Sequence, residues 1–162
     1  MLKFVCPLIT VDDIAASRHF YELLLGQRVK DDFGVNVAFE GNFAIHLKTH
    51  FQGLLGEAAR FPVTQKAHNG ELYFESDEVD AIYQRLTQAQ VEFAHPVQEQ
   101  PWGQRVMRFY DPDGHVIEIG EQMEAVVMRY YELGSSPDQI HEKTAMSVEF
   151  VEQAIRQAGK AG

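Results

Sequence analysis

The order of predicted secondary-structure elements repeats once along the chain, and this repeat constrains the fold more than any other feature of the sequence. Each copy consists of a strand, a helix and three further strands, and the second copy starts about 65 residues after the first. One helix per copy covers one face of its sheet and leaves the other face free to curve around a ligand. We therefore predict an α+β fold built from two βαβββ modules, at about residues 1–52 and 68–121.

In the first copy, residues 3–11 (KFVCPLITV) favour a strand, and Asp12 or Asp13 is placed to cap the helix that follows. Gly26 is expected to end this helix. Three short strand candidates come next: QRVKDDF, VNVAFEG and FAIHLKTHF. The following loop-like stretch contains one predicted helical turn at residues 54–60.

The second copy begins with the strand GELYFES and the helix EVDAIYQRLTQAQ, which Ser76 or Asp77 is placed to cap. Three strands are predicted after it: VEFAHPV, QRVMRFY and HVIEIGE. The last two are joined by the turn Asp111-Pro112-Asp113-Gly114, which has proline and glycine at favoured turn positions.

Residues 122–162 follow a different pattern, and we predict a helical extension there. The stretches MEAVVMRYYELG, SPDQIHEK and SVEFVEQAIRQAG indicate three short helices, whose spacing resembles a helix-turn-helix. Ser136 and Gln139 form a predicted capping box. Ser147 is expected to cap the third helix and Gly159 to end it.

The charge balance of the 162-residue chain excludes some classes of partner. Its formal net charge is -10, with 24 acidic residues against 14 basic ones. Proteins that bind nucleic acids or anionic membranes present basic surfaces, so we expect neither partner. The last predicted helix agrees with this, because Glu149 and Glu152 would repel phosphates. The single cysteine, Cys6, allows no internal disulfide, and no stretch approaches the roughly 20 apolar residues of a membrane helix, so we expect a cytoplasmic protein.

A carboxylate lies in the middle of the last strand of the second copy, between two isoleucines. Strand alternation places Glu118 on the face opposite these isoleucines, and the last strand of the first copy carries His46 in a similar position. The first strands carry Cys6 and Glu71, which differ by 71 − 6 = 65 positions. If the modules face one another, the four side chains converge and suit a divalent transition metal such as Zn, Ni, Mn or Fe. The metal would neutralise a carboxylate that is costly to bury unpaired.

The same residues have structural explanations that involve no metal. Glu118 could pair with Arg105 or Arg108 from the neighbouring strand. Cys6 could be a small buried apolar residue, and His46 could lie in the interior or face the solvent. Glu71 could be a solvated residue at the start of its strand.

Four further residues are candidates for contact with a small molecule. Trp102, the only tryptophan, and Arg105 could hold the planar or anionic part of a ligand. Tyr73 and Phe39 would act with Trp102 as recognition elements for a planar or cationic compound. An aromatic plug over the core explains Trp102 equally well.

Two stretches, VDDIAASRHFYELLLGQRV and PWGQRVMRFYDPDGHVIEIGE, resemble the vicinal oxygen chelate superfamily, which includes glyoxalase I, bleomycin-resistance proteins, fosfomycin-resistance enzymes, methylmalonyl-CoA epimerase and extradiol dioxygenases. The resemblance runs from Lys3 to Glu121. It implies that residues 1–121 form two βαβββ modules with a concave mixed or antiparallel sheet, that residues 122–162 are an extension, and that the protein is a homodimer.

The resemblance also implies a site and an activity. Metal ligands of the superfamily fall on the first and last strands of each module, at Cys6, His46, Glu71 and Glu118 here. Glu118 matches the usual glutamate, whereas Cys6 and Glu71 stand where His or Gln is usual. The implied activity is that of a metal-dependent lyase (lactoylglutathione-lyase-like), isomerase or dioxygenase, with Glu71 or Glu118 as general base. Bleomycin-resistance proteins bind their drug without a metal, so metal-free sequestration of a small molecule is the alternative.

Overall fold

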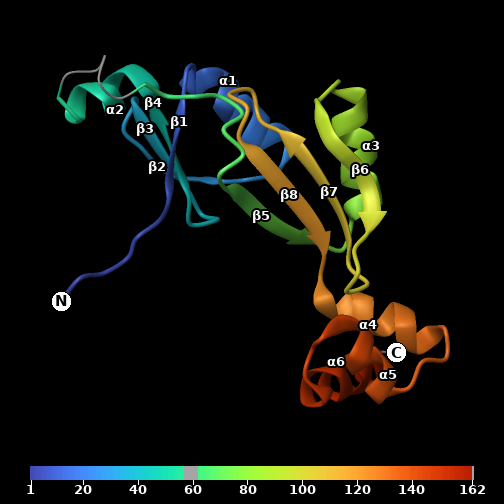
Figure 1. Ribbon diagram of the computed structural model, residues 1–162. Coiled ribbons are helices and arrows are strands. Elements are labelled where there is room, and N and C mark those ends of the chain that lie inside the picture. The colour runs from blue at the N-terminus through green and yellow to red at the C-terminus, as the bar shows by residue number, and fades with distance from the viewer. Residues whose placement is uncertain (57–61, 162) are drawn as a thin grey trace. The chain divides into compact units, whose positions relative to one another are not determined.

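The computed structural model describes residues 1–56 and 62–161 (Figure 1). The chain divides into two compact units, one made of residues 1–71 and 110–116, the other of residues 72–109 and the chain from 117 onward. The first unit contains one four-stranded sheet, and the second unit contains the other sheet except for a few residues at the ends of its strands. The two βαβββ modules expected from the sequence repeat are confirmed.

The sheet of the first module has the strand order β1-β4-β3-β2. Its strands are β1 (Leu8–Val11), β2 (Val29–Asp32), β3 (Asn36–Phe39) and β4 (Ala44–Leu47). The edge strand β1 runs parallel to β4, whereas β3 is antiparallel to both of its neighbours. In this register Thr10 lies opposite His46, so the first and last strands of the module are neighbours.

Helix α1 (Ile14–His19) and the π-helical turn η1 (Phe20–Leu24) connect β1 to β2. As predicted, Asp13 caps the helix, because its Oδ1 accepts the N–H groups of Ala15 and Ala16 at 2.8 and 3.1 Å. The buried ring of Tyr21 packs against Phe39 and Phe43, and these two rings stack at a centroid distance of 4.7 Å. This aromatic cluster forms the centre of the first module's core.

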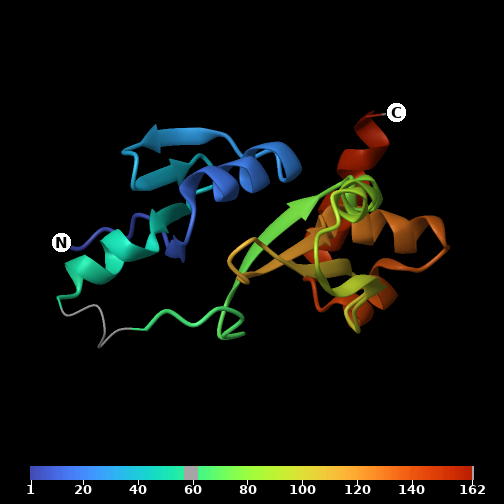
Figure 2. The ribbon, with the colours of Figure 1, turned by 90° about the horizontal axis from the view of Figure 1, so that it is seen from above.

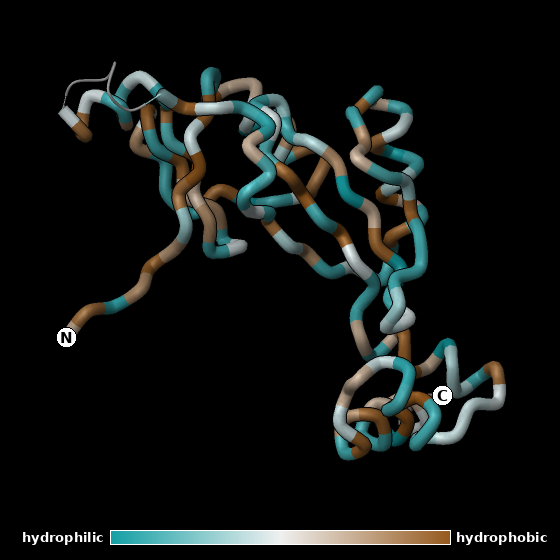
Figure 3. The backbone as a smooth tube through the Cα atoms, in the orientation of Figure 1, coloured by the Kyte–Doolittle hydropathy of each residue, from teal (hydrophilic) through white to brown (hydrophobic). Residues whose placement is uncertain are grey.

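Two strands of the first module are shorter than predicted. Residues 1–7 are extended but lie outside the sheet, and several of their apolar side chains are exposed. Figure 3 shows the hydropathy along this segment, which begins at the end marked N. The candidate strand FAIHLKTHF ends at Leu47, and helix α2 (Lys48–Leu54) follows directly. The change from strand to helix places His50 of α2 next to His46 of β4, whose Nε2 lies 2.7 Å from Nδ1 of His50. The helical turn predicted at residues 54–60 falls mostly outside the described residues.

The second sheet repeats the same order as β5-β8-β7-β6. Its elements are β5 (Glu71–Ser76), α3 (Val79–Gln88), β6 (Phe93–Glu99), β7 (Arg105–Tyr110) and β8 (Val116–Glu121). Helix α3 lies on one face of the sheet (Figures 1 and 2) and buries Val79, Ile82 and Leu86. The helix is capped one position later than predicted, at Glu78, whose N–H donates to Ser76 Oγ.

The last helices are α4 (Met123–Glu132), α5 (Pro137–Thr144) and α6 (Val148–Ala161), which cluster beyond the end of β8 (Figure 1). They have a small core of their own, made of Val127, Ile140, Val151 and Ala154. The predicted capping box of Ser136 and Gln139 is confirmed. Gly159 does not end the last helix, which continues to Ala161.

The helical cluster is anchored to the second module by Arg129. Its Nη2 donates to Glu121 Oε2 at 2.9 Å and to the carbonyl oxygen of Gly103 at 2.6 Å, and Tyr130 beside it donates to Glu99 at 2.9 Å. No helix in the described part of the chain is both long and apolar enough to cross a membrane.

Candidate functional site

The face of the second sheet that α3 does not cover carries a group of polar side chains, and we call it the helix-free face. Strand alternation assigns Tyr73 of β5, Glu118 of β8 and Arg108 of β7 to this face. Arg105 of β7 lies on the opposite face, the one that α3 covers, because its guanidinium binds Asp80 of α3 at 3.0 and 2.5 Å.

Glu118, the mid-strand carboxylate, is 5% exposed and forms an ion pair with Arg108 of the neighbouring strand. Arg108 also lies 3.3 Å from His95 Nε2 through its Nη1. A buried carboxylate needs a compensating charge, and the guanidinium supplies it. Of the two arginines that the sequence offered as partners, the structure selects Arg108.

A buried glutamine connects the two exposed aromatic residues of this module. Gln104 is 4% exposed, and its Oε1 accepts the indole N–H of Trp102 at 2.9 Å. Its Nε2 donates to the hydroxyl of Tyr73 at 2.8 Å and to the carbonyl oxygen of Glu121 at 2.7 Å. Sequence reasoning missed Gln104, although its position directly before β7 and two residues after Trp102 is a signal that could have found it.

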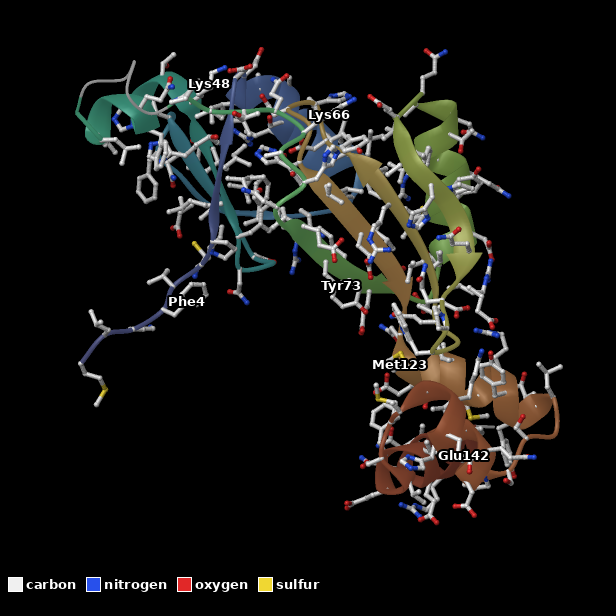
Figure 4. The ribbon with its side chains drawn as sticks, in the orientation of Figure 1. Phe4, Lys48, Lys66, Tyr73, Met123 and Glu142 are labelled. Atoms are coloured by element: carbon white, nitrogen blue, oxygen red, sulfur yellow. The ribbon has the colours of Figure 1, made fainter. Side chains whose placement is uncertain are left out.

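The hydroxyl of Tyr73 is held in its protonated form. It donates to Glu75 Oε1 at 2.7 Å. Partial burial, the hydrogen bond to Glu75 and the nearby charge of Glu118 together raise the pKa of Tyr73 to about 12. Tyr73, which is labelled in Figure 4, is nevertheless 48% exposed, and Trp102 is 38% exposed. The two rings therefore present fixed aromatic surface with neutral polar groups.

In the first module, the predicted ligand His46 is buried in β4. Its Nε2 lies 2.7 Å from Nδ1 of His50 in α2, a partner that sequence reasoning missed because residue 50 was placed in a strand. Burial, followed by the charge of His50, lowers the pKa of His46, so the imidazole favours its neutral form.

Of the remaining two predicted ligands, Cys6 lies before the first strand of its module and Glu71 is the first residue of β5. Cys6 is half-buried in the extended segment before β1, four positions before Thr10, which is the residue opposite His46. Glu71 is an exposed residue at the start of β5, where it borders a cavity of 270 Å³ together with His68, Gly70 and Val116.

The positions of these four side chains show which partners they have in place of a metal ion. A transition-metal centre needs three or four donors directed at one point. The described residues contain no group of three or more His, Cys, Asp and Glu side chains that could hold a metal. Glu118 is compensated by Arg108, and His46 faces His50. Within its own unit, each of these two side chains therefore already has a partner other than a metal ion.

Two of the predicted ligand-contact residues have structural roles instead. Phe39 is 1% exposed and stacks on Phe43 in the core, so it has no surface to offer a ligand. Arg105 is committed to Asp80 and also lies 3.5 Å from Glu121. Of the proposed contact residues, only Tyr73 and Trp102 combine exposure with a fixed position.

Comparison with known proteins places this fold in a family. The family model described as "Glyoxalase-like domain" matches residues 4–124. A protein of unknown function from Agrobacterium tumefaciens is 43% identical, with a TM-score of 0.67 over 75% of this chain and 95% of its own. No curated protein matches the chain.

Two more distant solved structures have related descriptions. A member of the glyoxalase/bleomycin resistance protein/dioxygenase superfamily from Sphaerobacter thermophilus is 26% identical, with a TM-score of 0.56 over 75% of this chain and 98% of its own. A lactoylglutathione lyase from Agrobacterium tumefaciens, at 21% identity, has the same TM-score over 76% of this chain and 96% of its own, and shows similarity of fold alone. Because the family model spans the whole of both βαβββ modules, this chain belongs to the glyoxalase-like family, within the superfamily that its sequence resembles.

Proposed function

We propose that this glyoxalase-like protein binds a small planar organic molecule, neutral or cationic, on the helix-free face of its second module. Tyr73 and Trp102 would provide the aromatic surface for the ligand. The proposed binding requires no metal ion, because the carboxylate that would have been its main ligand is already compensated by Arg108.

One observation carries this proposal: the buried amide of Gln104 holds both exposed rings. Most exposed aromatic side chains rotate freely and lose entropy when they bind a ligand. Rings that are already fixed lose less, and each stacking contact contributes about 0.5–1.5 kcal/mol beyond the area it buries. A fixed pair of half-exposed rings is therefore suited to recognising a flat molecule.

The charges around the rings favour a neutral or cationic ligand over an anion. The Tyr73 hydroxyl donates to the carboxylate of Glu75, and the Glu118 charge also acts on it. The chain as a whole has a formal net charge of -10. A cation above an aromatic face is attracted by the ring, and the surrounding carboxylates add to that attraction.

A metal-dependent lyase, isomerase or dioxygenase is the competing function. It would require Glu118 to leave Arg108 and to join at least two other donors. Separating a buried ion pair costs several kcal/mol, which metal binding would have to offset. The two functions therefore differ in a measurable requirement, the dependence on metal.

The test uses Trp102, whose fluorescence reports on the proposed site because it is the only tryptophan. The protein would be titrated with quinolinium, acridine and naphthalene derivatives. We expect a saturable fluorescence change with at least one of them. The substitutions Tyr73→Ala and Gln104→Ala should each weaken binding by about tenfold or more.

Tyr131→Ala is the matched control, because Tyr131 is an equally exposed tyrosine in helix α4. Its loss should leave the titration unchanged. A flat fluorescence response across the panel, or an equal response in Tyr73→Ala and Tyr131→Ala, would contradict the proposed site.

A further inference from the structure

The compact unit made of residues 1–71 and 110–116 contains a cavity of 340 Å³, and neither Tyr73 nor Trp102 is among its lining residues. Thr10 of β1, the linker 62–70 and the turn 113–116 line it. In Figure 2 this linker is the green trace that leads into β5. A volume of this size is in the range of small-molecule sites.

The wall of the cavity contains a histidine held in place by a buried carboxylate. The Oδ2 of Asp111 accepts the hydroxyl of Tyr21 at 2.7 Å and lies 2.9 Å from Nδ1 of His115. The Oδ1 accepts the backbone N–H groups of Asp113 and His115 at 3.0 and 2.8 Å. With Nδ1 directed at Asp111, the imidazole is fixed in orientation, and its other nitrogen, Nε2, is left for the cavity that His115 lines.

The same carboxylate favours a positive charge on this imidazole. Burial lowers the pKa of His115, but the hydrogen bond and the charge of Asp111, with a further contribution from Asp113, outweigh it, so the pKa lies above its ordinary value. A protonated imidazole directs an N–H donor from Nε2 into the cavity.

The linker brings two more nitrogen-bearing side chains to the same cavity. Lys66 Nζ lies 4.7 Å from the centre of the Tyr110 ring, and His68 Nε2 lies 2.8 Å from the Tyr110 hydroxyl. Lys66 and His68 both have left-handed backbone conformations, with φ of 51° and 54°. The linker is seated closely on the turn, since a Cβ at Gly114 would lie 3.0 Å from the backbone nitrogen of Lys66.

The acidic group in the lining is turned toward the protein. Asp113 accepts the backbone N–H of Asp12 at 2.7 Å and the hydroxyl of Ser17 at 3.2 Å. Burial raises the pKa of Asp113. The other polar lining side chains are hydrogen-bond donors or can serve as donors, namely Thr10, Thr64, Lys66, His68, Asn69 and His115.

We propose that this cavity binds a small anion, a carboxylate or a phosphate, with the Asp111-oriented imidazole of His115 and the ammonium of Lys66 as its principal donors. The donor-rich lining stands out in a chain with ten more acidic than basic residues. Charge-assisted hydrogen bonds to an oxyanion are the strongest contacts that such donors make. This site shares no residue with the proposed aromatic site, because neither the two rings, Tyr73 and Trp102, nor Gln104 lines the cavity.

Inorganic phosphate and acetate are the two probes, each titrated into the full chain and followed by the NMR signals of the histidine side chains. We expect saturable shifts of the His115 ring with at least one probe. Binding by phosphate alone would assign phosphates to the cavity, and binding by acetate alone would assign carboxylates. Trp102 fluorescence plays no part in this measurement, so its outcome is separate from that of the aromatic site.

Single substitutions test whether the anion binds in this cavity. His115→Gln and Lys66→Ala should each weaken it by about tenfold, the effect of losing one charged hydrogen bond. Lys66→Ala tests the proposal even if His115→Gln fails to fold, because Lys66 lies in a surface linker. Lys30→Ala removes an exposed lysine of β2 in the same compact unit and should leave the affinity for both probes unchanged. No saturable shift with either probe, or equal weakening by Lys66→Ala and Lys30→Ala, would overturn the proposal.

Discussion

The two modules share one topology but carry different chemistry at equivalent positions. The last strand of each contains a buried polar side chain, His46 in β4 and Glu118 in β8. His46 meets another histidine from the following helix, whereas Glu118 meets an arginine from the neighbouring strand. The compact unit that contains the first sheet also has a donor-lined cavity, whereas the second module has two fixed aromatic rings. A repeated backbone therefore does not repeat the site that is built on it.

The largest effect that distinguishes the modules should come from Arg108→Ala. This change leaves the carboxylate of Glu118 buried without its guanidinium, and we expect the free energy of unfolding to fall by about 3–5 kcal/mol. Urea denaturation followed by circular dichroism measures it. Arg28→Ala is the control from the first module, where an exposed arginine pairs with Glu40, and it should cost less than about 1 kcal/mol. Equal losses in the two variants would show that Glu118 does not depend on Arg108.

A smaller loss is expected from Tyr21→Phe. The hydroxyl of Tyr21 donates to the buried carboxylate of Asp111, whereas Leu86 occupies the position 65 residues later in the second module. Removing the hydroxyl should lower the free energy of unfolding by about 1–2 kcal/mol in the same urea experiment. Tyr83→Phe in α3 should cost no more than about 0.5 kcal/mol. A neutral Tyr21→Phe would show that the network around Asp111 adds nothing to stability.

The extended N-terminal segment offers a test of the expected homodimer. Leu2, Phe4 and Val5, in the segment that leads into the edge strand β1, are all at least 75% exposed. Figure 4 labels Phe4 in this segment. Such a segment is suited to contact with a second chain, so we expect Phe4→Asp to convert a dimer to a monomer. Light scattering after gel filtration measures the mass. Leu133→Asp, at an equally exposed leucine of the helical extension, should leave the dimer intact. A wild-type monomer would contradict the expectation.

The smallest effect compares two histidines of the same compact unit, His46 and His115, and depends on pH. The pKa of His46 is lowered in the folded state, so its neutral form is favoured and acidification below about pH 6.5 should destabilise the protein through this residue. The pKa of His115 is raised, so its contribution to stability is present below about pH 6.5 and is lost as the pH rises through the raised value.

Urea denaturation at about pH 5.5 and about pH 7.5, on either side of the ordinary histidine pKa, separates the two. His46→Gln should make the protein less sensitive to acid. His115→Asn should cost more stability at the lower pH than at the higher one. The same pH response in both variants would contradict the opposite environments of these histidines.

The sequence was most informative where the structure depends on local interactions. The Asp13 cap and the Ser136–Gln139 capping box rest on residues a few positions apart, and the structure confirms them. The repeat is confirmed as well, because each of its elements was predicted from the local pattern of its own residues. The first strand was predicted too long, because its apolar pattern does not reveal whether residues 3–7 have a partner strand.

The site was harder to predict because it depends on contacts across the sheet. The partner of Glu118 depends on the register between its strand and the neighbouring strand, which the sequence does not give. Arg105 and Arg108 were therefore both possible partners. The role of Phe39 depends on which face of its strand packs against the aromatic core, and its hydrophobic character alone does not reveal this. Gln104 was missed because its importance comes from Trp102 and Tyr73, and Tyr73 lies 31 residues away.

The central claim is that Arg108, rather than a metal ion, compensates Glu118, so that ligand binding at the aromatic residues is independent of metal. The most direct measurement is titration calorimetry with a planar ligand on chelator-treated protein, repeated after addition of Zn, Ni, Mn or Fe. We predict the same dissociation constant in every case. Binding that appears only with metal, together with retention of one metal ion per chain that Glu118→Gln abolishes, would contradict the claim.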